Sequence, residues 1–256
     1  MYRTFFIPKK NGKLRKIMEP APDLKELQYV LKSKLDQVPL HTAAHGFVAG
    51  KGIISNALVH RKSRYVLNID IKDFFPSVKF EQYPFCQIEQ HLTDEEVQWV
   101  KEVCFWNGSL PQGAPTSPVL ANIKLKEVDE TITAWCLERG LLYTRYADDM
   151  TFSCKDDYLK EFLTEFIENI DVVLGSIGLR RNTKKTKLMP YYQRQLVTGV
   201  VVNNERLTLA RTIKEQLFQE LKGLSRAALT VEQQGYLEYV NQVDSKTYNK
   251  LCQIMI

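Results

Sequence analysis

Residues 143–154 read YTRYADDMTFSC and set two adjacent carboxylates, Asp148 and Asp149, between two runs of β-forming residues. The flanking segments predict two strands joined by a tight turn, with the aspartates at the tip of the hairpin. Aspartate is common in such turns, so the pair alone is also explained as a simple turn. The segments that lie beside the hairpin decide whether the aspartates only form a turn or belong to a functional site.

A second stretch supplies a neighbour for the hairpin. Residues 65–71, YVLNIDI, form a nearly continuous β-branched and aromatic run that predicts a strand buried on both faces, with Asp70 near its end. If this strand adjoins the hairpin, three carboxylates converge, and such a cluster repels itself unless a cation occupies it. Hard oxygen ligands favour Mg²⁺. Two such ions about 4 Å apart suit an in-line displacement at phosphorus.

The composition is that of an ordinary globular chain. Of its 256 residues, 44% are hydrophobic and 25% are charged, which is enough to bury a core without disulfides or structural metals. The five cysteines are odd in number and have no C-x-x-C spacing, so neither a disulfide framework nor a zinc site is predicted. We see no secretory signal pattern and no apolar run of the roughly 18 residues that cross a bilayer, and therefore expect a cytoplasmic protein without a membrane partner.

Positive charge is concentrated in two segments, and the formal net charge is +5. The first 18 residues contain six cations and no acid, and residues 180–187, RRNTKKTK, contain five more cations. Blocks of this kind are usually solvated surface, but two of them around a carboxylate cluster are suited to phosphate contacts. The charge pattern favours a polyanionic partner.

Six motifs, in one order along about 200 residues, make the sequence similar to the reverse transcriptases. YADD at 146–149 resembles the paired-aspartate motif of that family, and NIDIKDFFPSV at 68–78 resembles its first catalytic-aspartate motif. LPQGAPTSPVLAN at 110–122 resembles the loop and helix that support the template and the incoming nucleotide. The other three resemble the fingers hairpin and two later palm motifs: IPKKNGKLRKI at 7–17, GLRRNTKKT at 178–186 and VTGVVVN at 197–203.

Two shorter motifs resemble those of the bacterial retron reverse transcriptases within that family. One is an N-A-x-x-H motif ahead of the first catalytic aspartate, and the other is a V-T-G triplet in the late palm. The matching residues are Asn56, Ala57 and His60, and Val197, Thr198 and Gly199. The resemblance assigns them to recognition of a structured RNA, for which Asn and His in exposed loops are suited. A buried, hydrogen-bonded histidine explains His60 equally well.

The resemblance implies an α+β right-hand polymerase with an antiparallel palm sheet, α/β fingers and a small helical thumb. We expect the fingers at 1–64 and 79–113, the palm at 65–78 and 114–205, and the thumb at 206–256. The implied enzyme is an RNA-directed DNA polymerase that uses two Mg²⁺ ions, or Mn²⁺ in their place. It is expected to synthesise single-stranded DNA on a structured noncoding RNA, giving a branched RNA–DNA, in phage defence. Its expected partners are a structured noncoding RNA as template and primer, the RNA–DNA product, deoxynucleoside triphosphates and an effector protein.

The resemblance also gives the catalytic candidates their roles. Asp70 and Asp148 are expected to bind both metal ions together with the backbone carbonyl of Ile71, while Asp149 supplies supporting charge in the metal site. Lys185 is the candidate general acid for the departing pyrophosphate, and a solvated cation is the alternative.

The nucleotide-binding candidates follow in the same way. Phe75 is expected under the sugar, where its bulk excludes a 2′-hydroxyl, and a core aromatic is the alternative. Arg15, with Lys9 or Lys10, is the candidate triphosphate clamp, because Arg grips phosphate through two donors. Gln112 and Gly113 are expected to position the nucleotide and template through close backbone approach.

Other functions stay open at this point. An intron-like or another defence-associated bacterial reverse transcriptase would carry similar motifs and use a different template. An RNA-binding structural protein on an inactive polymerase scaffold is the alternative from another class, and a two-metal nuclease would have to use these same aspartates. His41 and His45 have the spacing of a metal-binding pair on a helix, but they lack the glutamate and the third ligand of such a site.

Overall fold

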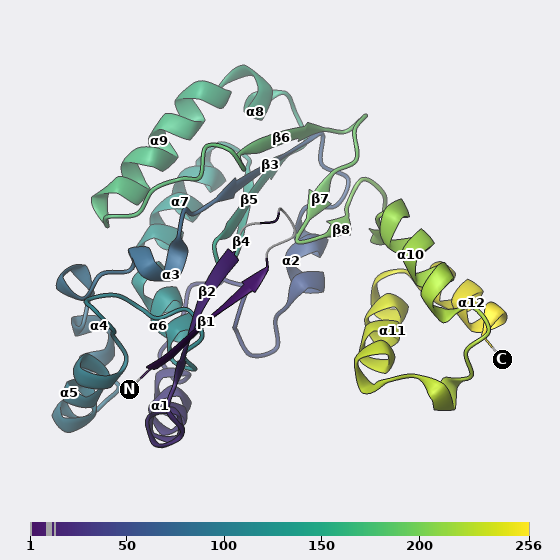
Figure 1. Ribbon diagram of the computed structural model, residues 1–256. Helices are drawn as coiled ribbons and strands as arrows, with labels where there is room; N and C mark the ends of the chain where they lie inside the picture. The colour runs from purple at the N-terminus through teal and green to yellow at the C-terminus, as the bar shows by residue number, and fades with distance from the viewer. Residues whose placement is uncertain (1, 9–11, 13, 256) are drawn as a thin grey trace.

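The computed structural model of the protein describes residues 2–8, 12 and 14–255. Lys9 and Lys10, the lysines of the predicted clamp, lie outside them. The chain forms an N-terminal hairpin with nearby helices, a central sheet backed by helices, and a helical C-terminal lobe to one side (Figure 1). None of the helices in this part of the chain combines the length and the apolarity that crossing a bilayer requires.

The central sheet is built around the predicted buried strand. Its four antiparallel strands lie in the order β4-β5-β3-β6. Val66, Leu67 and Ile69 are fully buried, which explains why this run takes an inner position. The strands are β3 (Tyr65–Asp70), β4 (Leu142–Tyr146), β5 (Asp149–Cys154) and β6 (Lys187–Pro190).

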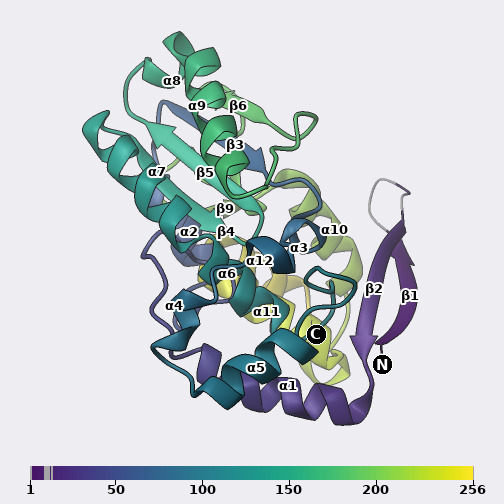
Figure 2. The ribbon, with the colours of Figure 1, turned by 90° about the vertical axis from the view of Figure 1, so that its left-hand side faces the viewer.

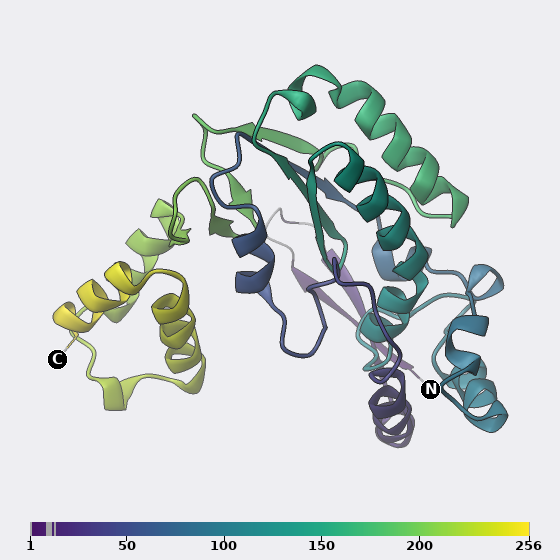
Figure 3. The same ribbon diagram turned by 180° about the vertical axis from the view of Figure 1, so that it is seen from behind.

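Helices on one face of the sheet form the larger hydrophobic core. Seen from behind, α7 (Lys126–Glu138) and α9 (Leu163–Ser176) cover that face (Figure 3). Phe152 of β5 and Phe166 of α9 meet edge to face, with ring centroids 4.9 Å apart. The opposite face receives α2 (Ile53–Val59), whose Ala57 shares the second core with Val66.

Two helices expected to be continuous are broken. The proline after Ser117 and the amphipathic pattern up to Gly140 predict one long helix. It is divided at Leu125, because α6 (Ser117–Lys124) packs on α1 and α3 whereas α7 packs on β4. The apolar spacing over 156–175 also predicts one helix, but the chain forms two, α8 (Tyr158–Glu161) and α9, with the break at Phe162.

The N-terminal region contains the predicted hairpin, β1 (Tyr2–Pro8) and β2 (Leu14–Pro20), which stands beside the rest of the molecule (Figure 2). A helix follows at once with Pro22 as its first residue, a position where proline is favoured. The predicted capping box of Thr93 and Glu96 opens α5. The helices here are α1 (Pro22–Leu35), α3 (Phe74–Ser77), η1 (Phe80–Gln82), α4 (Cys86–Glu89) and α5 (Asp94–Val103).

The C-terminal lobe is built on a small three-stranded sheet, and its hydrophobic core extends to Ala57 of α2, Val66 of β3 and Met189 of β6. Asp244 joins its parts, since the carboxylate accepts from the Leu209 and Thr247 amides and pairs with Lys214 Nζ at 2.6 Å. The elements are β7 (Leu196–Val197), β8 (Val200–Val201), β9 (Thr208–Leu209), α10 (Arg211–Leu221), η2 (Arg226–Ala228), α11 (Val231–Val243) and α12 (Ser245–Ile254).

Candidate active site

The β4–β5 hairpin carries the paired aspartates as predicted. Tyr146 pairs with Asp149, so Ala147 and Asp148 form a two-residue turn. Ala147 has φ 56°, a conformation usually left to glycine in such turns. Holding a non-glycine residue there costs about 1–3 kcal/mol and requires support from its surroundings.

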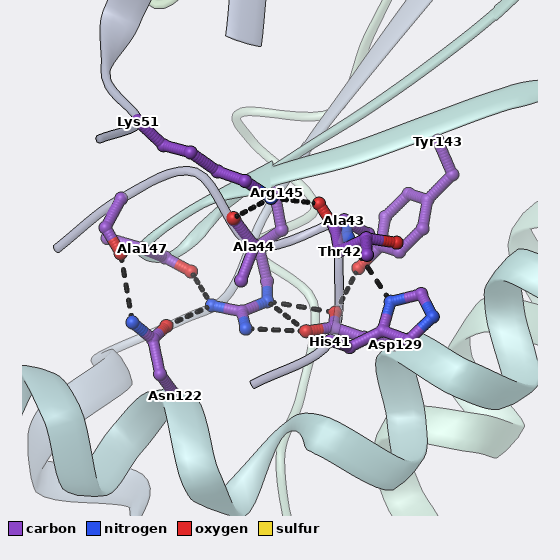
Figure 4. A network of polar contacts seen from close by, with 11 residues as sticks. His41, Thr42, Ala43, Ala44, Lys51, Asn122, Asp129, Tyr143, Arg145 and Ala147 are labelled. Carbon is purple, nitrogen blue, oxygen red and sulfur yellow. Dashed lines mark hydrogen bonds and ion pairs between the residues drawn. The ribbon is translucent and has the colours of Figure 1, made fainter. Parts of the chain in front are cut away.

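Arg145 supplies one support from beneath the turn (Figure 4). The side chain is fully buried, and its guanidinium donates to both carboxylate oxygens of Asp129 at 2.6–3.2 Å. The same group donates to Asn122 Oδ1 at 2.8 Å and to the Ala147 carbonyl at 3.0 Å. A buried ion pair needs such complete hydrogen bonding to offset its desolvation. Arg145 therefore fixes the residue that precedes Asp148.

Gly46 supplies a second support by close backbone approach. The chain at 43–46 runs beside β4, where the Arg145 amide donates to the Ala43 carbonyl at 2.8 Å. Asn122 Nδ2 donates to the Gly46 carbonyl at 2.9 Å. A Cβ atom on Gly46 would lie 2.5 Å from the Ala147 amide nitrogen, so only glycine fits against the turn.

Arg145, Asp129 and Gly46 were not among the predicted site residues. A charged residue within the buried strand YTRY was the signal for Arg145. Asp129 lies on the exposed-looking pattern KEVDE, and Gly46 lies about 100 residues before the turn. Only their contacts in the folded chain identify these two residues.

The three carboxylates meet at one end of the central sheet. Asp70 pairs with Asp149 in the register of β3 and β5, and the Ile71 amide donates to the Asp148 carbonyl at 2.9 Å. Desolvation and the charge of Asp70 raise the pKa of Asp148. Desolvation, followed by the charges of Asp148 and Asp70, raises the pKa of Asp149 to about 6. The predicted convergence of the two strands is confirmed, and the carboxylates repel one another.

Lys185 and Asn182 balance part of this charge. Lys185 Nζ lies 2.5 Å from Asp70 Oδ2, and Asn182 Nδ2 donates to Asp70 Oδ1 at 2.9 Å. The Asn182 amide also donates to the Asp70 carbonyl at 2.7 Å, which fixes the motif GLRRNTKKT beside β3. Burial lowers the pKa of Lys185, but the hydrogen bond and charge of Asp70 outweigh it, so the net pKa is raised. Lys185 is thus a cation within this acidic cluster.

The donor set fits a hard divalent cation. Within residues 2–8, 12 and 14–255, no three acidic, histidine or cysteine side chains converge on a point in the way that would hold one metal ion. Asp70 instead points toward Lys185. The Ile71 carbonyl receives no hydrogen bond from the described residues. The pKa values of Asp148 and Asp149 are raised by desolvation first and by the neighbouring carboxylates second, and a bound cation would offset both effects. The oxygen ligands are therefore of the type that Mg²⁺ or Mn²⁺ takes.

The nucleotide-binding candidates Phe75 and Arg15 differ in burial. Phe74 is buried in the core, whereas Phe75 beside it packs against that core and is only partly buried. Arg15 is exposed on β2, and its charge opposes, to a small extent, the rise that desolvation and Asp70 cause in the pKa of Asp148. These placements are compatible with the predicted roles.

Gln112 and Gly113 anchor the N-terminal hairpin. The Gln112 carbonyl accepts from the Met18 amide at 2.8 Å. Gly113 has φ 122°, and a Cβ atom there would lie 2.8 Å from Ile17 Cγ2. Both residues thus hold β2 against the loop that precedes α6.

The residues predicted to recognise RNA are divided between interior and surface. Asn56, Ala57, His60 and Val197 have no exposed surface. Asn56 and His60 therefore do not lie in an exposed loop, and the buried, hydrogen-bonded reading of His60 is the one the structure supports. Thr198 is half-buried and Gly199 is exposed at the β7–β8 turn.

Comparison with known proteins finds a family profile and individual relatives that are all reverse transcriptases. The sequence profile of the family "Reverse transcriptase (RNA-dependent DNA polymerase)" matches residues 7–228. The Retron Ec73 reverse transcriptase of Escherichia coli is 34% identical over 96% of this chain and 84% of its own length. The Retron Mx162 reverse transcriptase of Myxococcus xanthus is 36% identical over 79% of this chain, but the match spans only 47% of that protein.

A solved structure confirms the fold. Telomerase from Candida albicans, in complex with a fragment of telomeric RNA, superposes with a TM-score of 0.61 over 99% of this chain and 57% of its own, at 11% identity. At that identity the similarity concerns the fold alone, which is the predicted α+β polymerase fold with an antiparallel sheet. From the profile and the retron relatives together, the chain belongs to the reverse transcriptase (RNA-dependent DNA polymerase) family, among the retron reverse transcriptases.

Proposed function

We propose that this chain synthesises single-stranded DNA on a structured noncoding RNA, as an RNA-directed DNA polymerase of the retron type. The observation that carries the proposal is the meeting of Asp70, Asp148 and Asp149 at one end of the sheet, beside Lys185. Family membership and the retron relatives support it. A branched RNA–DNA product, a role in phage defence, an effector protein as partner and a cytoplasmic location belong to the same proposal.

We divide the chain into the fingers, palm and thumb subdomains of a right-hand polymerase. The fingers are 1–64 and 79–113, the palm is 65–78 and 114–205, and the thumb is 206–256. The last boundary is supported by the C-terminal helices, whose buried leucines and valines cluster with the small sheet β7–β9 rather than with the larger core.

The chain's own residues would divide the chemistry among them. Asp70, Asp148 and the Ile71 carbonyl would hold two Mg²⁺ ions, and bound ions would supply activation of the attacking hydroxyl and charge stabilisation of the leaving pyrophosphate. Lys185, already a cation beside Asp70, would give a proton to that leaving group. Arg15 would bind the triphosphate, and Phe75 would pack under the sugar and exclude a 2′-hydroxyl.

The test is primer extension with a matched pair of aspartate variants. Asp148→Asn removes a carboxylate charge without changing side-chain size, so we expect DNA synthesis to be abolished while RNA binding is largely retained. Asp94→Asn makes the same change on the exposed first turn of α5 and should leave synthesis unchanged. Synthesis by Asp148→Asn at the rate of the parent would refute the assignment.

A further inference from the structure

A chain of buried polar side chains connects the central sheet to the β7–β8 turn. Ser153 of β5 contacts His60 Nδ1 at 2.8 Å, and His60 Nε2 contacts Thr144 of β4 at 2.7 Å. Thr144 Oγ1 donates to Asn56 Oδ1 at 2.6 Å, and Asn56 Nδ2 donates to Thr198 Oγ1 at 3.5 Å. We call these five side chains the relay. The first four have almost no exposed surface, and the fifth is half-buried.

The proton positions in the relay follow from simple valence. Thr144 has one hydroxyl proton and gives it to Asn56, so the contact with His60 Nε2 must be one in which the imidazole donates. Burial, with a smaller contribution from the charge of His45, lowers the pKa of His60 to about 3, so the ring is neutral. Its Nδ1 then has no proton and accepts from the Ser153 hydroxyl. Every hydrogen bond therefore donates in the same direction, from Ser153 toward Thr198.

The end of the relay lies at a strained turn. Thr198 and Gly199 connect Val197 to Val200, with φ values of 46° and 85°. Two positive φ angles define a turn that glycine, asparagine or aspartate makes at low cost, whereas a β-branched residue there is an outlier. Strain of this kind points to a function for the side chain that causes it. Glycine in this position would have no hydroxyl group. The hydroxyl of Thr198 is also the group that Asn56 contacts in the relay.

The relay leaves that hydroxyl with a free proton. Asn56 Nδ2 donates to Thr198 Oγ1 and so occupies a lone pair of this oxygen. Among the residues that the structure describes, no acceptor takes the Thr198 hydroxyl proton. The group therefore keeps an unused donor on a half-buried residue, next to the exposed Gly199.

We propose that Thr198 donates this proton to a backbone oxygen of RNA, a phosphate or a 2′-hydroxyl, and that Asn56 and His60 are positioning residues that act through Thr198. The proposal rests on the proposed function, because it names how the RNA partner is held. It explains why the two short motifs of the sequence occur together: the buried one orients the hydroxyl of the exposed one. Neither Asn56 nor His60 touches the nucleic acid.

The test compares isosteric variants in two binding assays. One probe is an in vitro transcript of the RNA that copurifies with the parent protein, and the other is oligo(dT) annealed to poly(rA). Thr198→Val keeps the shape and the strain but removes the donor, and we expect the Kd for the transcript to rise about tenfold. Thr198→Ser should restore binding. An equal loss on both probes would identify the primer–template backbone as the acceptor, and a loss on the transcript alone would identify the structured RNA.

The relay itself is tested by a double-variant cycle. Thr144→Val interrupts the relay without contacting RNA and should weaken binding, whereas Thr144→Ser should not. Thr144→Val combined with Thr198→Val should bind no more weakly than Thr198→Val alone, because both remove the same contact. Thr133→Val is the matched control, since the half-buried Thr133 hydroxyl on α7 has no hydrogen-bond partner to lose. Ser153→Ala interrupts the far end and replaces Thr144→Val if thermal unfolding shows that variant to be unfolded.

Two results would overturn the proposal. One is an unchanged Kd on both probes for Thr198→Val, and the other is additive losses in the cycle, which would show that Thr144 and Thr198 act independently. Failure of the proposed function is seen separately, because the parent would then not extend oligo(dT) on poly(rA) while the binding comparison still stands.

Discussion

The contact between Gly46 and the catalytic turn predicts that one methyl group will disable the enzyme. In Gly46→Ala the new Cβ atom would lie 2.5 Å from the Ala147 amide nitrogen, whereas ordinary contacts begin at 3.4 Å. The turn must therefore move by close to 0.9 Å, the difference between these distances. No positive φ is involved at Gly46, so the effect is purely steric.

The displacement reaches Asp148 directly, because Asp148 is bonded to Ala147. A misplacement of about 1 Å in a catalytic group costs roughly 100-fold in rate, or about 2.7 kcal/mol in the activation barrier. The same overpacking costs about 1–3 kcal/mol of folding stability. We therefore expect a folded protein with a kcat about 100-fold below that of the parent.

Primer extension under single-turnover conditions, with urea unfolding alongside, measures both quantities. Gly175→Ala is the matched control, because its Cβ atom would meet nothing within 4 Å in α9. The control should keep full activity and gain about 0.5–1 kcal/mol in stability. A folded Gly46→Ala protein with the kcat of the parent would refute the claim that this contact sets the position of Asp148.

Three further predictions concern the surrounding site. Asp129→Asn leaves the fully buried Arg145 without a counter-charge, so urea unfolding should show a loss of about 3–5 kcal/mol, against less than about 0.5 for Asp94→Asn. Phe75→Ala should incorporate ribonucleotides more readily in a primer-extension assay, whereas Phe74→Ala should mainly destabilise, because only Phe74 is a core residue. Because the pKa of Asp149 is raised to about 6, its carboxyl group gains a proton as the pH falls through about 6, and Mg²⁺ affinity measured by calorimetry should fall there in the parent but much less in Asp149→Asn.

The sequence predicted those parts of the fold that depend on local pattern. The strand at 65–71 and the hairpin at 143–154 form where they were expected. Thr93 with Glu96 and Thr230 with Gln233 have the spacing that predicts a capping box, and both boxes form. The motifs also predicted correctly that Asp70 and the paired aspartates adjoin. The reason is that strand pairing is the lowest-cost way to satisfy the backbone of a buried apolar strand.

What the sequence could not predict depends on contacts between distant segments. The helix breaks at Leu125 although the sequence pattern there is regular, because α6 before it and α7 after it pack on different elements. His60 gave no sign of its burial, since an isolated histidine has the same signature in a core and in a loop. Asp129 and Gly46 acquire their roles only by meeting Arg145 and Ala147 across the fold.

The two hydrophobic cores have a mechanical consequence. Of the buried side chains described in the central sheet, only Val66 and Met189 enter the second core, so the sheet and the C-terminal helices share little apolar surface. Contacts across a junction this small separate at a lower free energy than is needed to unfold either core. We therefore expect the C-terminal helices to move relative to the sheet at a lower cost than unfolding either core, while the carboxylates keep their positions, so that one protein could admit a bulky folded substrate and then follow its lengthening product.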